Sequence, residues 1–160
     1  MTRQLDAFID LDRTFSKIRM DSDISDDTDL SSRHGKSGDL CWPDLLNHHR
    51  VVLLSEAGSG KTAEIRNATR RLRAEGKTAF FLRIEHVMAQ LEDAFEEDGS
   101  YDEFERWRIS DTEGWLLLDS VDEARLGDPR EFENAIRKLG RLTKDIRAKA
   151  HILITGRSTA

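Results

Sequence analysis

The sequence has little of several residue types that mark specialised classes of protein. Its 160 residues include one cysteine, Cys41, and two prolines. A single cysteine excludes an intrachain disulfide and a cysteine-based metal site, which fits a reducing compartment. No apolar run approaches the length of about 20 residues that spans a bilayer, and no secretory signal follows Met1. We therefore expect a soluble, cytoplasmic protein with no membrane partner.

The sequence also lacks an excess of positive charge. Its 25 Lys and Arg residues are outnumbered by 31 Asp and Glu residues, which gives a net charge of -6. Nucleic-acid-binding domains are usually basic, so nucleic acid is not an expected partner. Hydrophobic residues make up 38% of the chain and charged residues 35%. This composition is typical of one packed domain with an extensively charged surface.

The composition of the chain changes near residue 40. Residues 1–39 form an N-terminal extension that is partly irregular and, from residue 21 onward, rich in Asp, Ser and Gly. Residues 40–160 alternate short apolar runs with amphipathic stretches, which predicts an α/β fold with a mainly parallel sheet between helices. Strands are expected over 51–54, 78–83, 115–118 and 151–155, and helices over 44–49, 61–75, 84–97 and 128–146. The first strand has the pattern of one buried on both faces.

The sharpest motif lies between the first expected strand and the helix that follows it. Residues 55–62 nearly match the phosphate-binding loop G-x-x-x-x-G-K-[ST], the Walker A motif. Its glycines let backbone N–H groups turn toward phosphate oxygens, and the positive end of the next helix faces the same anion. The alternative is a chance turn before a helix. The expected nucleotide-binding residues are Ser55, Glu56, Ala57, Gly58, Ser59, Gly60, Lys61 and Thr62.

Two residues of this loop carry specific roles. Lys61 would reach the β- and γ-phosphates, and the Thr62 hydroxyl would bind Mg²⁺. Ser55 replaces the first glycine of the motif. A serine is tolerated there only if its backbone φ is negative, because positive φ is costly for residues with a Cβ.

Acidic residues follow the strand expected over 115–118, as in a Walker B motif. Asp119 would hold Mg²⁺ directly or through water. Asp122 or Glu123 would orient or deprotonate the attacking water, and the sequence does not choose between them. The alternative is a solvated acidic loop. After the last strand, Arg157 would sense the γ-phosphate or stabilise charge during its transfer, or else is an ordinary surface arginine.

Together the three motifs resemble those of the NACHT group of STAND-type P-loop ATPases, relatives of the AAA+ ATPases. That family shows G-E-A-G-S-G-K-[ST], then D-[GAS]-x-D-E after a hydrophobic strand, then T-x-R after another strand. The chain matches at residues 56–62, at residues 119–123 and at Thr155 and Arg157, and it departs at Ser55. The resemblance covers about residues 42–157.

The resemblance implies a three-layer α/β/α P-loop NTPase fold that binds ATP or ADP with Mg²⁺. It implies slow or regulated hydrolysis that drives a conformational switch in a signalling protein, including proteins of defence. Other protein domains or copies of the chain are the implied partners. The family's domain continues with a fifth strand and further domains, so we expect the chain to be truncated at its C-terminal end.

Two other functions stay open at this point. The first is a non-catalytic nucleotide-binding or protein-interaction module derived from a truncated NTPase. The second is an ATPase stimulated by nucleic acid. A turnover assay, with and without nucleic acid, separates all three hypotheses.

Overall fold

The computed structural model describes residues 12–18, 39–56, 58–95, 99–119 and 129–157. The chain forms two compact units, Met1–Leu45 and Leu46–Ala160. In the first unit, Phe15 and Leu40 form an antiparallel bridge with two backbone hydrogen bonds of 2.8 Å. The Phe15 ring meets the Trp42 ring edge-on, with 5.4 Å between centroids. Helix α1 (Trp42–Leu46) begins two residues before the helix that was predicted over 44–49.

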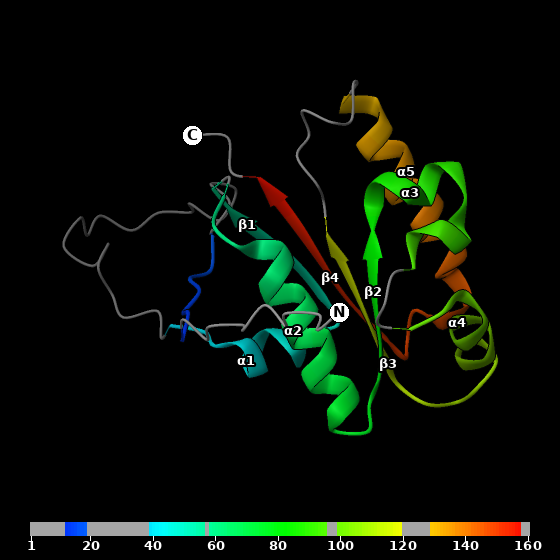
Figure 1. The fold of residues 1–160 in the computed structure, drawn as a ribbon, viewed down its shortest axis with the longest axis horizontal. Helices are drawn as coiled ribbons and strands as arrows, with labels where there is room; N and C mark the ends of the chain where they lie inside the picture. Colours follow the sequence, from blue (N-terminus) through cyan, green and yellow to red (C-terminus); the bar gives the residue numbers. More distant parts are fainter. Residues whose placement is uncertain (1–11, 19–38, 57, 96–98, 120–128, 158–160) are drawn as a thin grey trace, which may run out of the picture. The chain divides into compact units, whose positions relative to one another are not determined.

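The second unit is an α/β fold with a four-stranded, all-parallel sheet flanked by helices (Figure 1). The sheet order is β1-β4-β3-β2. The predicted class and the parallel sheet are confirmed. The strands are β1 (Arg50–Ser55), β2 (Thr78–Arg83), β3 (Gly114–Asp119) and β4 (Ala150–Arg157). The helices are α2 (Lys61–Ala74), α3 (Ile84–Ala89), α4 (Tyr101–Arg108) and α5 (Pro129–Leu142), with 3-10 helices η2 (Leu91–Ala94) and η3 (Lys144–Ile146).

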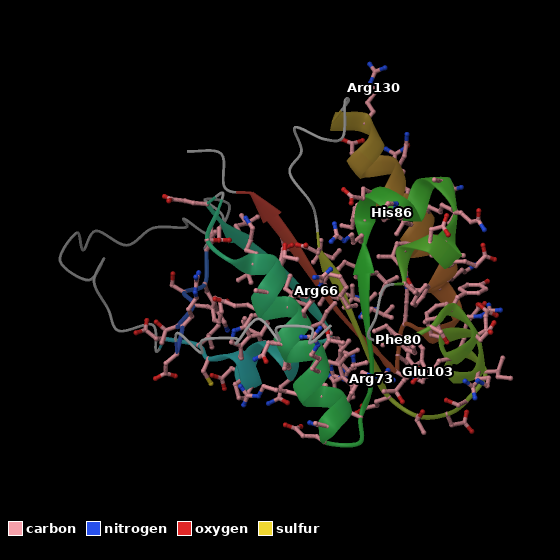
Figure 2. The ribbon with its side chains drawn as sticks, in the orientation of Figure 1. Arg66, Arg73, Phe80, His86, Glu103 and Arg130 are labelled. Carbon is pink, nitrogen blue, oxygen red and sulfur yellow. The ribbon has the colours of Figure 1, made fainter. Side chains whose placement is uncertain are left out.

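Buried side chains alternate between the two faces of the central strands. On one face, Leu116 and Leu118 of β3 join an apolar cluster with side chains of α3, α4 and α5. On the other face, Leu117 and Phe81 are buried outside that cluster. The Arg66 guanidinium of α2 lies 4.9 Å from the centroid of the Phe81 ring, which places α2 on this second face (Figure 2). Cover on both faces explains the continuous apolar runs of β2 and β3.

Strand β1 differs from the prediction that it is buried on both faces. Val52 is 69% exposed and Leu54 is 43% exposed, and exposure alternates along the strand. Among the described strands, β1 pairs only with β4. The prediction was wrong because an apolar run reports side-chain type and not whether a neighbouring strand or helix covers it.

The helix predicted over 84–97 is also interrupted. Helix α3 ends at Ala89, and Gln90 has extended angles of φ -146 and ψ 122 before η2 begins. Phe95 then forms an antiparallel bridge with Leu82, and its ring packs edge-on against Phe80 at 5.8 Å. The apolar stripe predicted one helix, but Val87, Leu91, Ala94 and Phe95 all reach the same cluster from a broken helix. The helix predicted over 128–146 likewise divides into α5 and η3.

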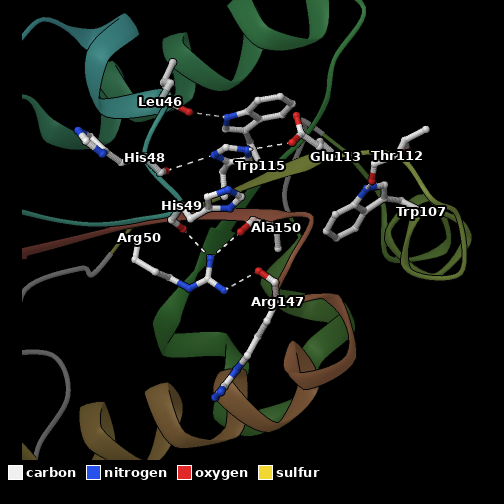
Figure 3. A network of polar contacts seen from close by, with 11 residues as sticks. Leu46, His48, His49, Arg50, Trp107, Thr112, Glu113, Trp115, Arg147 and Ala150 are labelled. Carbon is white, nitrogen blue, oxygen red and sulfur yellow. Dashed lines mark hydrogen bonds and ion pairs between the residues drawn. The ribbon is translucent and has the colours of Figure 1, made fainter.

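The edge of the sheet where the strands begin is held by packing and by carbonyl contacts (Figure 3). The Arg50 guanidinium donates to the carbonyl of His49 at 2.5 Å and to that of Arg147 at 3.2 Å. Burial and, to a lesser extent, the charge of Arg147 lower the pKa of Arg50. The His151 ring lies stacked between Trp115, at 4.7 Å, and His49, at 4.3 Å. These contacts hold the first residues of β1, β3 and β4 in place.

Gly114, the buried first residue of β3, lets the Trp107 indole pack directly against the strand backbone. A Cβ at this position would lie 2.4 Å from Cε2 of Trp107, which is 4% exposed. We expect Gly114→Ala to lower the free energy of unfolding by about 1–3 kcal/mol, because overpacking forces the indole or the strand to move. Urea denaturation of the purified variant measures this change.

Gly140 provides the matched control for this substitution. It lies inside α5, and an added Cβ meets nothing within 4 Å. Gly140→Ala should raise the free energy of unfolding by about 0.5–1 kcal/mol, because alanine favours helix more than glycine does. Equal stability of the Gly114→Ala variant and the wild type would contradict the packing argument.

Candidate functional site

The four strands bring distant segments of the chain to one edge of the sheet. Because all the strands are parallel, their carboxyl ends lie together. In the register, Ser55 of β1 faces Arg157 of β4, and Asp119 of β3 faces Arg83 of β2. The three motifs found in the sequence therefore follow or end strands at the same edge, where open α/β sheets bind ligands.

The described residues between β1 and α2 include two glycines with left-handed backbone angles. Gly58 and Gly60 have φ angles of 72 and 83, which residues with a Cβ rarely adopt. Ser55 is the last residue of β1 and has no positive φ, so the serine that replaces the first glycine is accommodated. Its hydroxyl lies 3.1 Å from that of Ser59 and closes the loop across its base.

The loop leads directly into the amino end of α2. Gly60 is the residue that precedes the helix, and as a glycine it has no side chain that could cap it. The first N–H groups of a helix have no partner within it and carry a partial positive charge. The amino end of a helix is therefore a place where an anion can bind.

Lys61 places an ammonium group between the loop and β4. Its Nζ donates to the carbonyl oxygens of Ser55 at 2.9 Å, Glu56 at 3.1 Å and Gly156 at 3.5 Å. The side chain is therefore folded back along its own loop, with its charge at the edge of the sheet. This position sets a compact cation beside the amino end of α2, so both contribute positive potential to the same place.

Asp119 is the acceptor at the centre of a hydroxyl network. The residue is 1% exposed. Its Oδ2 accepts a hydrogen bond from the Thr62 hydroxyl at 2.6 Å, and its Oδ1 accepts one from the Thr155 hydroxyl at 3.2 Å. These bonds fix the orientation of the carboxylate between α2 and β4.

The oxygen atoms of this network are ligands of the kind that Mg²⁺ takes in proteins. Among the described residues, no group of three or more His, Cys, Asp and Glu side chains could hold a metal ion. Mg²⁺ is usually held by one or two carboxylates together with water and substrate phosphate oxygens. Thr62 and Asp119 supply one hydroxyl and one carboxylate within 2.6 Å of each other. The arrangement can thus hold a divalent cation next to a bound anion.

The structure brings together only some of the predicted site residues. It places the loop residues that it describes, with Thr62 and Asp119, at one edge of the sheet. Ala57, Asp122 and Glu123 lie outside the described residues. The backbone of Arg157 ends β4 beside Ser55. Its side chain lies outside the part of the chain that the structure describes.

Two residues at this edge have no role in the sequence predictions. Thr155 binds Asp119, and Arg83 ends β2 beside it. Each stands at the end of an expected strand, and Thr155 also matches the threonine of the T-x-R motif, but neither signal points to Asp119. The order of the strands in the sheet is needed to see that both residues flank Asp119.

We compared the chain with protein-family models, curated proteins and solved structures, and none of them matches it. Within the part of the chain that the structure describes, no helix combines the length and the apolar character needed to cross a membrane.

Proposed function

We propose that the chain carries an ATP-binding P-loop NTPase domain of the NACHT kind, with a three-layer α/β/α fold. In this proposal it binds Mg-ATP at residues 55–62 and hydrolyses it to drive a conformational switch in a signalling protein. One observation carries the proposal. The Lys61 ammonium and the glycine-containing loop lie beside a hydroxyl and carboxylate pair, Thr62 and Asp119, whose oxygens are 2.6 Å apart.

In this function the loop and Lys61 bind the phosphates. The N–H groups at the start of α2 and the Lys61 ammonium supply donors, and Lys61 exchanges carbonyl oxygens of its own loop for phosphate oxygens. Thr62 and Asp119 hold Mg²⁺, which neutralises charge on the phosphates when bound. Thr155 keeps the Asp119 carboxylate in one orientation.

Hydrolysis in this proposal also uses residues whose roles come from the sequence motifs alone. Asp122 or Glu123 would orient the attacking water or remove its proton, and Arg157 would stabilise charge on the transferred phosphoryl group. The preference for ATP over GTP follows from the family resemblance alone. So do the signalling role and the expected partners, namely other domains or copies of the chain.

Binding of Mg-ATP to the wild-type chain is the direct test. A ligand that binds only the folded state at about 100 times its Kd stabilises that state by about 2.7 kcal/mol. For a domain of this size, the melting temperature should rise by roughly 5–10 °C. Scanning calorimetry with ATP, ADP and GTP, each with Mg²⁺ and with EDTA, measures the shift. No shift and no binding at millimolar Mg-ATP would reject the proposal.

A phosphate-release assay then separates hydrolysis from binding alone. Turnover above background supports an NTPase, whereas binding without turnover supports the non-catalytic module. Turnover that rises when DNA or RNA is added at low salt would favour the nucleic-acid-stimulated enzyme.

A further inference from the structure

Arg83 is a second cationic residue at the edge of the sheet that carries Asp119. The two residues are direct partners in the parallel register of β2 and β3. Adjacent strands lie about 4.8 Å apart, and partners on them project to the same face. Leu82 and Leu118, one residue earlier, belong to the cluster with α3, α4 and α5. Arg83 and Asp119 therefore start on the α2 face, from which Thr62 donates to Asp119.

The Arg83 side chain is held by an acidic residue of its own segment. Its guanidinium lies 3.4 Å from the carboxylate of Glu85, and the side chains of Arg83 and Glu85 are 23% and 20% exposed. The same carboxylate lies 3.5 Å from Nε2 of His86, which follows at the start of α3 (Figure 2). The planar fork of a guanidinium matches the geometry of phosphate oxygens.

We propose that Arg83 contacts the terminal phosphoryl group of a bound nucleoside triphosphate and makes the site prefer triphosphate to diphosphate. The inference rests on the proposed function. In P-loop enzymes the metal ion bridges the β- and γ-phosphates, so the metal ligand marks the terminal end of the nucleotide. In the proposed function Asp119 would be that ligand, and Arg83 is its register partner on the strand farther from Lys61. Glu85 competes with the phosphoryl group for the same guanidinium.

Calorimetric titration tests this role by comparing Mg-ADP with the Mg²⁺ complex of a non-hydrolysable ATP analogue. We expect Arg83→Gln to weaken binding of the triphosphate analogue about 10- to 100-fold, the range for losing a charged hydrogen bond. Binding of Mg-ADP should change less than about 3-fold, because ADP lacks the group that Arg83 contacts.

Two further variants sharpen the test. Glu85→Gln removes the competing carboxylate and should strengthen binding of the analogue about 2- to 10-fold, with Mg-ADP unchanged. Arg66→Gln is the matched control. It removes another arginine on the α2 face, one that lies over the Phe81 ring of the same strand, and should leave both affinities unchanged.

The possible outcomes separate the two proposals. Wild-type protein that binds neither nucleotide would contradict the proposed function itself. Wild-type protein that binds both, with Arg83→Gln weakening them equally or not at all, would overturn the role of Arg83 alone. Melting curves without nucleotide show whether each variant folds. If Arg83→Gln does not fold, Arg83→Lys takes its place in the test. This variant keeps the positive charge but loses the forked guanidinium group, and it should still weaken binding of the triphosphate analogue about 5-fold or more.

Discussion

Lys61→Ala should remove most of the rise in melting temperature that Mg-ATP produces. The substitution removes the ammonium that donates to the carbonyls of Ser55, Glu56 and Gly156, which is the cation available to phosphate in the loop. Truncating one partner of a hydrogen-bonded charge pair costs about 2–5 kcal/mol of binding free energy. The affinity should therefore fall by about 30-fold or more. Titration calorimetry and melting curves with Mg-ATP measure the loss.

Lys77→Ala is the control for Lys61→Ala. Lys77 follows the other end of α2, pairs with Glu75 at 2.8 Å and lies on the exposed surface. Its loss removes the same charge from the chain but leaves the loop intact, so Mg-ATP should raise the melting temperature as in the wild type. A nucleotide shift as large in Lys61→Ala as in the wild type would show that the nucleotide binds elsewhere or makes no use of the loop lysine.

The local part of the candidate site could be predicted from the sequence because its geometry depends on adjacent residues. A loop with glycines at 58 and 60, followed by Lys61 and Thr62, needs only the strand before it and the helix after it. Both elements form where the apolar pattern predicts them. The positive φ angles of the two glycines explain why these residue types occur at these positions.

The long-range part of the site could not be predicted from the same patterns. Thr155 meets Asp119 only because β4 lies beside β3 in the sheet. Arg83 is the register partner of Asp119 on the other side because β2 pairs with β3 there. Strand order comes from how helices cover both faces of the whole sheet, and no window of local sequence contains that information.

Errors in the element predictions have the same origin. The apolar run of β1 predicted a strand buried on both faces, yet Val52 and Leu54 are exposed. The stripe that includes Val87 and Phe95 predicted a single helix, whereas Gln90 is extended. The hydrophobic pattern identifies side chains that are expected to be buried. It does not specify the backbone path by which they reach the core, nor the neighbours that cover them.

Asp119→Asn should separate binding of the nucleotide from its dependence on Mg²⁺. Asparagine keeps the size of the side chain, and its amide can still bond to the hydroxyls of Thr62 and Thr155. It removes the negative charge that would hold the metal ion. Turnover should therefore fall by about 100- to 1000-fold, as when one preorganised electrostatic group is lost from an active site. Titrations with and without Mg²⁺ should give the same affinity, unlike those of the wild type.

The stability of the same variant without nucleotide provides an independent measurement. The wild-type carboxylate is 1% exposed, and a charge in so buried a position is costly unless it is fully compensated. Asp119→Asn should thus melt at the same temperature as the wild type or higher, the usual pattern for a residue kept for function. Asp111→Asn, at an exposed position between α4 and β3, should leave melting, turnover and Mg²⁺ dependence unchanged. Lower stability of Asp119→Asn, with full turnover and unchanged Mg²⁺ dependence, would mean that the Asp119 network holds the fold and not a metal ion.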